Sequence, residues 1–211
     1  MTHQSGIGIL IFDYDGVIAD TERLHWRAWA EILELRGIPF TWDQYCEIGR
    51  GMQEAQMIAT LGQLVDDPSL LFGVELQITL RNEMIRDLCI SVPPIQEATI
   101  ELLHSLKGYR LGLVTSSARS DVEPVLRTAG IFECFDAVVF GDDVERHKPA
   151  PDPYLLLGSL LDVKTGLVFE DSDAGIASAQ EAGFVVIPIG DPADLPRIVD
   201  REIRGDRNKS D

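Results

Sequence analysis

Positive charge is scarce in this chain of 211 residues: Lys and Arg total 18 against 35 Asp and Glu, so the formal net charge is −17. A surface this acidic repels nucleic acid and anionic lipid at long range, and we expect neither as a partner. The same repulsion works against a phosphate-bearing substrate, but salt screens it within about 8 Å at physiological ionic strength. A local cationic pocket can therefore still bind an anion.

Cysteines and long apolar runs are also scarce. Cys46, Cys89 and Cys134 lie far apart and never form C-x-x-C, so the sequence predicts three reduced thiols rather than a zinc site or a disulfide framework. No apolar run reaches the roughly 18–20 residues that a membrane-spanning helix needs. Residues 1–6 lack the basic start and apolar core of a signal peptide, so we expect a cytoplasmic protein.

Apolar runs typical of buried strands alternate with helical patterns over most of the chain. The expected strands are Ile7–Phe12, Leu111–Val114, Ala137–Phe140, Gly166–Phe169 and Phe184–Ile187. The expected helices among them are Gln96–Lys107, Ser120–Ala129, Pro153–Leu161 and Asp173–Ala182. This alternation predicts an α/β fold, with a Rossmann-like, doubly wound parallel sheet covered by helices on both faces. Ligands in such folds bind at the carboxyl ends of the strands.

One segment, residues 20–89, breaks this alternation because it contains helical patterns and no convincing strand. The helical patterns are Thr21–Arg36, Gln53–Leu61 and Pro68–Leu88. A crossover between parallel strands rarely needs more than one helix. We therefore interpret residues 20–89 as a helical cap domain inserted into a core formed by residues 1–19 and 90–211. The alternative is that these helices are outer helices of the same domain.

Two aspartates, Asp13 and Asp15, directly follow the first expected strand. Side chains at positions i and i+2 of a strand project to the same side, so the two carboxylates would lie together. Gly16 allows the chain to turn sharply after them. Two like charges held this close need a proton or a cation between them. We favour a hard divalent cation, which carboxylate oxygens bind well and which supports chemistry beside it.

The later strands also end in polar side chains, of three kinds. These are the hydroxyls of Thr115, Ser116 and Ser117, the ammonium of Lys148, and the carboxylates of Glu170 and Asp171. Taken singly, such residues are common in turns, exposed loops and helix caps. Together, at successive strand ends, they indicate one site that combines a metal cage, an anion cradle and a cation.

These motifs resemble those of the haloacid dehalogenase-like superfamily of phosphotransferases, and the resemblance covers nearly the whole chain. The matching segments are Asp13-Tyr14-Asp15-Gly16-Val17, Thr115 with Ser116 and Ser117, Lys148-Pro149-Ala150-Pro151-Asp152, and Glu170-Asp171-Ser172-Asp173-Ala174-Gly175. The helical insert is similar to the helical cap of that superfamily. Within it, the segment from Asp15 to Thr21, followed by His25, resembles β-phosphoglucomutase and its sugar-phosphatase relatives.

The resemblance implies catalytic roles for four residues. Asp13 would attack phosphorus and form an aspartyl-phosphate. Asp15 would protonate the leaving oxygen and then act as the base for the attacking water. Thr115 and Lys148 would neutralise the transferring phosphoryl group, in chemistry that depends mainly on positioning and charge stabilisation.

The resemblance also implies Mg²⁺ as the cofactor. Its ligands would be Asp13, Asp171 and the backbone carbonyl of Asp15, with Glu170 as a further candidate. All of these are oxygen donors, as Mg²⁺ requires.

Substrate contacts are implied at five further positions. They are Ser116, Ser117, His25, Arg50 and Arg81. For His25 the alternative is a histidine satisfied by a neighbour on its helix, and for Arg81 a solvated charge. A mutase must hold a second phosphate through a cap arginine, and our alignment puts Met52 at that position, two residues from Arg50. This departure favours hydrolysis.

We therefore expect a Mg²⁺-dependent phosphatase that hydrolyses small phosphate monoesters, such as sugar phosphates, through an aspartyl-phosphate intermediate. The first alternative is a phosphomutase of the β-phosphoglucomutase kind. A non-catalytic acidic binding module is a third hypothesis, against which the complete set of charged motif residues argues. We expect a small-molecule phosphate ester as the partner, and a monomer or weak dimer.

Overall fold

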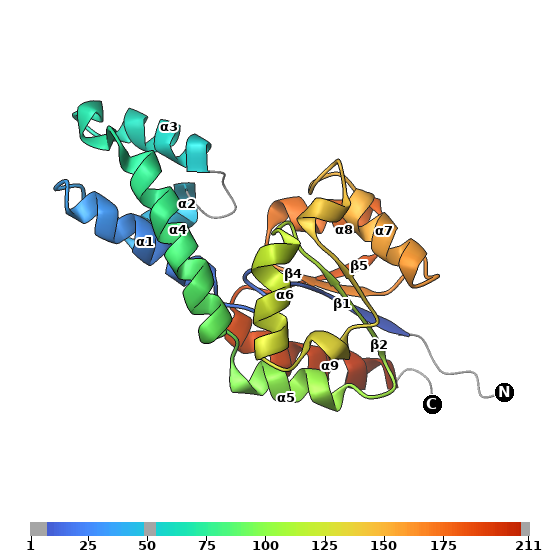
Figure 1. Cartoon of the computed structure of the whole chain (residues 1–211). Helices are drawn as coiled ribbons and strands as arrows, with labels where there is room; N and C mark the ends of the chain where they lie inside the picture. The colour runs from blue at the N-terminus through green and yellow to red at the C-terminus, as the bar shows by residue number, and fades with distance from the viewer. Residues whose placement is uncertain (1–7, 49–53, 208–211) are drawn as a thin grey trace. The chain divides into compact units, whose positions relative to one another are not determined.

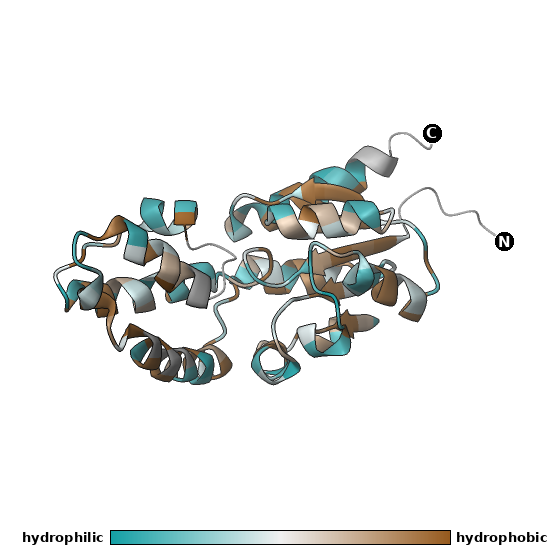
Figure 2. Cartoon of the chain, turned by 90° about the horizontal axis from the view of Figure 1, so that it is seen from above, coloured by the Kyte–Doolittle hydropathy of each residue, from teal (hydrophilic) through white to brown (hydrophobic). Residues whose placement is uncertain are grey.

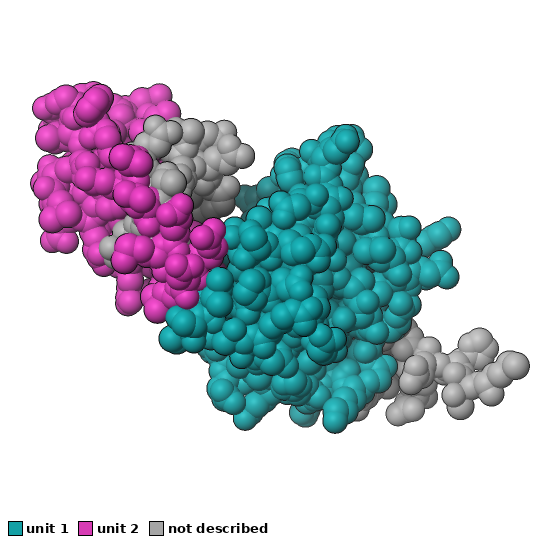
Figure 3. All heavy atoms as spheres, in the orientation of Figure 1, with its two compact units in different colours: residues 1–20, 90–211 teal, residues 21–89 magenta. Residues whose placement is uncertain are grey.

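The computed structural model describes residues 8–48 and 54–207 of the chain (Figure 1). The chain divides into two compact units (Figure 3). Unit 1 combines residues 1–20 with residues 90–211, and unit 2 is residues 21–89. No helix in the described ranges is both long enough and apolar enough to cross a membrane.

Within the described residues, unit 1 is built on a five-stranded parallel sheet with the strand order β3-β2-β1-β4-β5. The strands are β1 (Ile9–Asp13), β2 (Arg110–Val114), β3 (Ala137–Val139), β4 (Leu167–Glu170) and β5 (Val185–Pro188). In the register of the sheet, Phe12 of β1 pairs with Leu113 of β2 and with Phe169 of β4. Because the strands are parallel, their carboxyl ends meet at one edge. The predicted doubly wound α/β fold is confirmed.

Helices cover both faces of this sheet. They are α5 (Glu97–Ser105), α6 (Arg119–Thr128), α7 (Asp152–Leu160), α8 (Asp173–Glu181) and α9 (Leu195–Arg207). Helices α7 and α8 pack together, as do α5 and α9, and Figure 1 shows the two pairs on opposite sides of the sheet. Helices α5 to α8 each lead the chain to the amino end of the next strand, so the loops that follow the strands gather at the carboxyl edge.

The core of unit 1 lies between the sheet and its helices. All five residues of β1 and all four of β4 are buried, as expected for strands covered on both faces. The hydropathy colouring in Figure 2 shows the apolar residues concentrated on the strands. On the side of α7, one cluster joins Ile9, Val114 and Val139 to Tyr154 and Leu157.

Unit 2 is helical and has a core of its own. Its elements are α1 (Glu22–Glu34), α2 (Trp42–Ile48), α3 (Glu54–Leu64), a 3₁₀ turn at Pro68–Leu71 and α4 (Val74–Ser91). Trp29, Leu33, Tyr45, Met57 and Ile78 are buried together in this core.

The elements differ from the sequence-based expectations in three ways. The expected helix at 68–88 is divided, because Gly73 has a φ of +74°, which an α-helix does not allow. Helices α2 and α9 were not expected, since their charged residues obscure a short apolar face. Helix α6 begins at Arg119, whose amide donates to the Asp142 carboxylate (2.9 Å), and so lacks the expected cap at Ser120.

Candidate active site

The centre of the candidate site is a buried ammonium between two carboxylates. Asp13 ends β1, Glu170 ends the neighbouring strand β4, and Lys148 comes from the segment between β3 and α7. The Lys148 Nζ donates to Asp13 Oδ1 at 2.5 Å and to Glu170 Oε1 at 2.7 Å. The Lys148 and Asp13 side chains are each 7% exposed and that of Glu170 is 0% exposed. Three charges from distant parts of the sequence therefore share one desolvated pocket.

The Glu170 carboxylate is held on both of its oxygens. Its Oε2 accepts from the amide and the hydroxyl of Ser172, at 2.8 and 3.1 Å. Its Oε1 accepts from Lys148 and, at 3.4 Å, from the Tyr154 hydroxyl. A Cβ at Gly175 would lie 1.5 Å from Oε1, so the first turn of α8 leaves room for this carboxylate only because it carries no side chain there.

The residues that could hold a metal ion are Asp13, Glu170 and Asp171. One carboxylate oxygen from each lies within 4.8 Å of the others. Three hard oxygen donors at this spacing fit a divalent cation such as Mg²⁺ or Ca²⁺ better than a softer metal. The donor set therefore agrees with the cofactor class expected from the sequence.

The charges of this pocket alter one another's protonation. Burial raises the pKa of Asp13 well above its usual range; Lys148 opposes this shift and the nearby carboxylates add to it. Burial alone would lower the pKa of Lys148, but Asp13, Tyr154 and Glu170 outweigh it and raise that pKa well above its ordinary value. Lys148 therefore stays charged. A proton and a metal ion compete for Asp13, so metal affinity is expected to rise with pH.

The hydroxyl residues after β2 contact the second aspartate of the motif. Ser117 Oγ donates to Asp15 Oδ2 at 2.7 Å, and Thr115 Oγ1 lies 3.4 Å from the same oxygen. The Ser117 amide donates to Thr115 Oγ1 (3.0 Å), and the Ser117 carbonyl accepts from the amide of Gly141 (2.9 Å). The loops after β2 and β3 are thus tied together and hold the Ser117 hydroxyl against Asp15. Ser116 is exposed.

The remaining predicted residues, His25, Arg50 and Arg81, belong to unit 2. His25 is half-buried on α1 of unit 2. Arg50 lies outside the described residues, as does Met52. Arg81 belongs to α4, but its side chain is not among those described. Their expected substrate contacts stay predictions.

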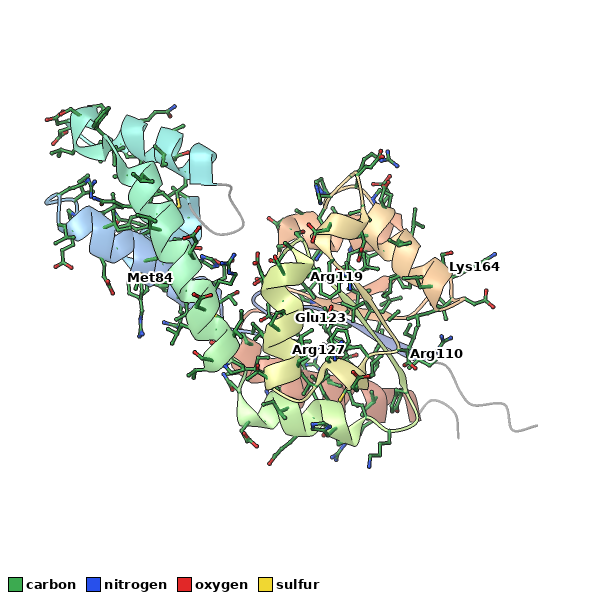
Figure 4. All side chains as sticks on the ribbon, in the orientation of Figure 1. Met84, Arg110, Arg119, Glu123, Arg127 and Lys164 are labelled. Atoms are coloured by element: carbon green, nitrogen blue, oxygen red, sulfur yellow. The ribbon has the colours of Figure 1, made fainter. Side chains whose placement is uncertain are left out.

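Sequence reasoning missed Arg119, which ties the loops after β2 and β3 together. Its guanidinium bonds Asp143 at 3.0 Å and lies over the Phe140 ring, 4.2 Å from the centroid. Figure 4 shows Arg119 at one end of a row with Glu123 and Arg127 along α6. The two adjacent aspartates in the sequence, Asp142 and Asp143, could have indicated that a cationic side chain binds there. The contacts of Ser172 and Tyr154 with Glu170 were also not predicted, because they depend on side-chain directions that sequence spacing does not reveal.

Replacing Gly16 by alanine is expected to weaken metal binding and lower the melting temperature. Gly16 has a φ of +76°, and a Cβ there would lie 2.2 Å from Asp171 Oδ2. The left-handed backbone costs alanine about 1–2 kcal/mol, and the contact would also displace the carboxylate. Gly130→Ala is the control, because its φ is +73° and no described atom lies within 4 Å of the added Cβ.

Isothermal titration calorimetry with Mg²⁺ and thermal melts separate the two effects of that substitution. Both variants should melt at lower temperature, but only Gly16→Ala should lose Mg²⁺ affinity. Equal affinity in the two variants would contradict Asp171 as a ligand.

Comparison with known proteins agrees with the fold and the motifs. Residues 10–189 match the family model of haloacid dehalogenase-like hydrolases. The fructose-1-phosphate phosphatase of Escherichia coli (strain K12) is 34% identical over 186 residues, which cover 85% of this chain and 95% of that protein. A phosphorylated carbohydrates phosphatase of Thermotoga maritima is 33% identical over 178 residues, covering 83% and 81%. CbbY from Rhodobacter sphaeroides, solved in complex with phosphate, superposes with a TM-score of 0.64 at 28% identity over 87% of each chain. The chain belongs to the haloacid dehalogenase-like hydrolase family.

Proposed function

We propose that this chain is a Mg²⁺-dependent phosphatase of small phosphate monoesters, with sugar phosphates or similar metabolites as substrates. The observation that carries the proposal is the buried contact between Lys148 and Asp13 beside the cluster of Asp13, Glu170 and Asp171. This arrangement supports the proposal because it brings together a carboxylate that can act as a nucleophile, an ammonium that can bind phosphoryl oxygens and three carboxylates that could hold a metal ion. The two similar phosphatases, both named for sugar-phosphate substrates, support the substrate class.

The reaction takes place in two displacements at phosphorus. In the first, an Asp13 oxygen bonds to phosphorus while the bond to the ester oxygen breaks, and Asp15 gives its proton to that oxygen. In the second, a water attacks the aspartyl-phosphate, Asp15 takes the water's proton, and Asp13 leaves as a carboxylate. Lys148 and the donors around Thr115 offset the charge on the phosphoryl oxygens in both steps.

The cofactor would be held by oxygen donors of this same pocket. Asp13 and Asp171, with the backbone carbonyl of Asp15 and with Glu170, are the ligands we propose for Mg²⁺. The bound ion would supply positive charge to the phosphoryl oxygens and help to orient the ester. The hydrogen bonds of Ser117 and Thr115 to Asp15 would orient the general acid.

We propose unit 2 as the cap, with residues 20–89 as its extent in the sequence. Its separate hydrophobic core and its insertion between β1 and β2 support this role. It would carry His25, Arg50 and Arg81 as substrate contacts, and such a module can exclude water from the reaction and set specificity.

The test is a phosphate-release assay with a panel of phosphate esters. Fructose 1-phosphate, glucose 6-phosphate and an aryl phosphate should each be tried, with ³¹P NMR to detect any isomerised sugar phosphate. We expect release of inorganic phosphate that stops in excess chelator and returns with Mg²⁺. Undiminished turnover in chelator would contradict the metal site. Isomerisation without phosphate release would favour the mutase alternative.

A further inference from the structure

We propose that Tyr154 is a positioning residue of this enzyme, whose ring holds the Lys148 ammonium in place beside Asp13. The proposal rests on the proposed function, because it assigns Tyr154 to the cation of that reaction. The phosphatase mechanism itself makes no use of this tyrosine.

The contacts of Tyr154 reach the centre of the site. Tyr154 lies in the first turn of α7 and is 0% exposed. The Lys148 Nζ is 5.3 Å from the centroid of its ring, within the distance of about 6 Å at which a cation and an aromatic face attract each other. Its hydroxyl lies 3.4 Å from Glu170 Oε1, the oxygen that also accepts from Lys148.

Lysine needs such support more than arginine would. Its ammonium is a point charge on a flexible four-carbon stem, without the planar fork that fixes a guanidinium. Asp13 and Glu170 hold the Lys148 ammonium by two hydrogen bonds, and the first of these carboxylates is consumed as the nucleophile in the proposed reaction. The Tyr154 ring is a contact that the reaction leaves unchanged.

Tyr154 also helps to keep water from the ion pair. It is fully buried, and its ring packs against that of Phe184, with 6.3 Å between the ring centroids. A smaller side chain would admit water, which would weaken the electrostatic interaction of Lys148 with the phosphoryl group.

The ring rather than the hydroxyl should carry the effect. At 3.4 Å, the hydroxyl is much farther from Glu170 than the 2.5–2.7 Å typical of an O–H group bound to a carboxylate. Tyr154→Phe should therefore keep kcat within about twofold, whereas Tyr154→Met should lower kcat about tenfold with little change in KM. Methionine is the replacement because its flexible side chain fills irregular core space.

Leu157→Ala is the matched control for destabilisation. Leu157 is 0% exposed, lies on α7 and belongs to the same cluster as Tyr154, but it packs against Gly112 of β2. Leu157→Ala should melt at a lower temperature than wild type. Its kcat, measured below the melting temperatures of all variants, should equal that of wild type. If Leu157→Ala and Tyr154→Met lose kcat in proportion to their melting temperatures, Tyr154 has only a packing role and the proposal is wrong.

A double-mutant cycle with Lys148→Met tests whether Tyr154 acts through Lys148. In that background, Tyr154→Met should cause no further loss of kcat, since the group that it positions is absent. An equal tenfold loss in both backgrounds would overturn the proposal. Failure of wild-type enzyme to release phosphate from any ester would instead overturn the proposed function.

Fluorinated phenylalanines at position 154 give a test that keeps the shape of the ring. Successive fluorines remove negative charge from the aromatic face and weaken its attraction for an ammonium. We expect kcat to fall stepwise with one, two and three fluorines while the melting temperature stays near that of Tyr154→Phe. A flat series would exclude the cation–ring contact as the positioning device.

Discussion

Asp13→Asn is expected to abolish phosphate release and to leave the fold intact. The amide of asparagine is a poor nucleophile, so the aspartyl-phosphate cannot form. We therefore expect a loss of about 10³-fold or more in kcat. The stability cost should be small because asparagine keeps the size of the aspartate and an oxygen that can still accept from Lys148. Lys148 keeps Glu170 as a charged partner. Phosphate-release kinetics and thermal melts measure the two quantities.

The matched control for that substitution is Asp136→Asn. Asp136 Oδ2 accepts from the amide of Leu111 at 2.8 Å, at the amino end of β2 and away from the carboxyl edge of the sheet. Asparagine keeps an acceptor oxygen, so this variant should retain both activity and melting temperature. Wild-type turnover in Asp13→Asn would overturn the assignment of the nucleophile, and with it the aspartyl-phosphate route.

The part of this site that the sequence predicts is the part set by strand topology. Asp13 and Glu170 end buried apolar runs, and parallel pairing of β1 with β4 brings those ends together whatever the side-chain details. The same reasoning predicts the hydroxyls after β2 and the lysine after β3. The apolar pattern of a strand is a local property that a short segment of sequence already shows.

The rest depends on contacts that no local pattern encodes. Tyr154 looks in the sequence like any core aromatic of a helix, and its place beside Lys148 follows from the packing of α7 on the sheet. The Ser117 hydroxyl points toward Asp15 because the Ser117 carbonyl, in the loop after β2, accepts a hydrogen bond from the Gly141 amide in the loop after β3. At Gly73 the local pattern gave a wrong prediction. The apolar pattern continues through this residue, but its φ of +74° divides the helix that was expected there.

Lys148→Met is expected to lower both activity and stability. Activity should fall about 10²–10³-fold, because the cation for the transferring phosphoryl group is lost. The free energy of unfolding should fall by about 3–5 kcal/mol, since Asp13 and Glu170 would be left buried without their partner. Phosphate-release assays and urea unfolding in metal-free buffer measure the two effects.

The stability loss in Lys148→Met should depend on pH with a defined sign. Lys148 lowers the pKa of Asp13 in the wild type, so its removal raises that pKa further above the unfolded value. A carboxyl whose pKa is raised in the folded state stabilises that state as pH falls. The difference in free energy of unfolding between wild type and Lys148→Met should therefore be largest above the raised pKa of Asp13 and should shrink below it. Adding Glu170→Gln removes one of the two uncompensated charges and should recover stability but not activity. If Lys148→Met unfolds like wild type at every pH, the buried ion pair at the centre of this site does not form in solution.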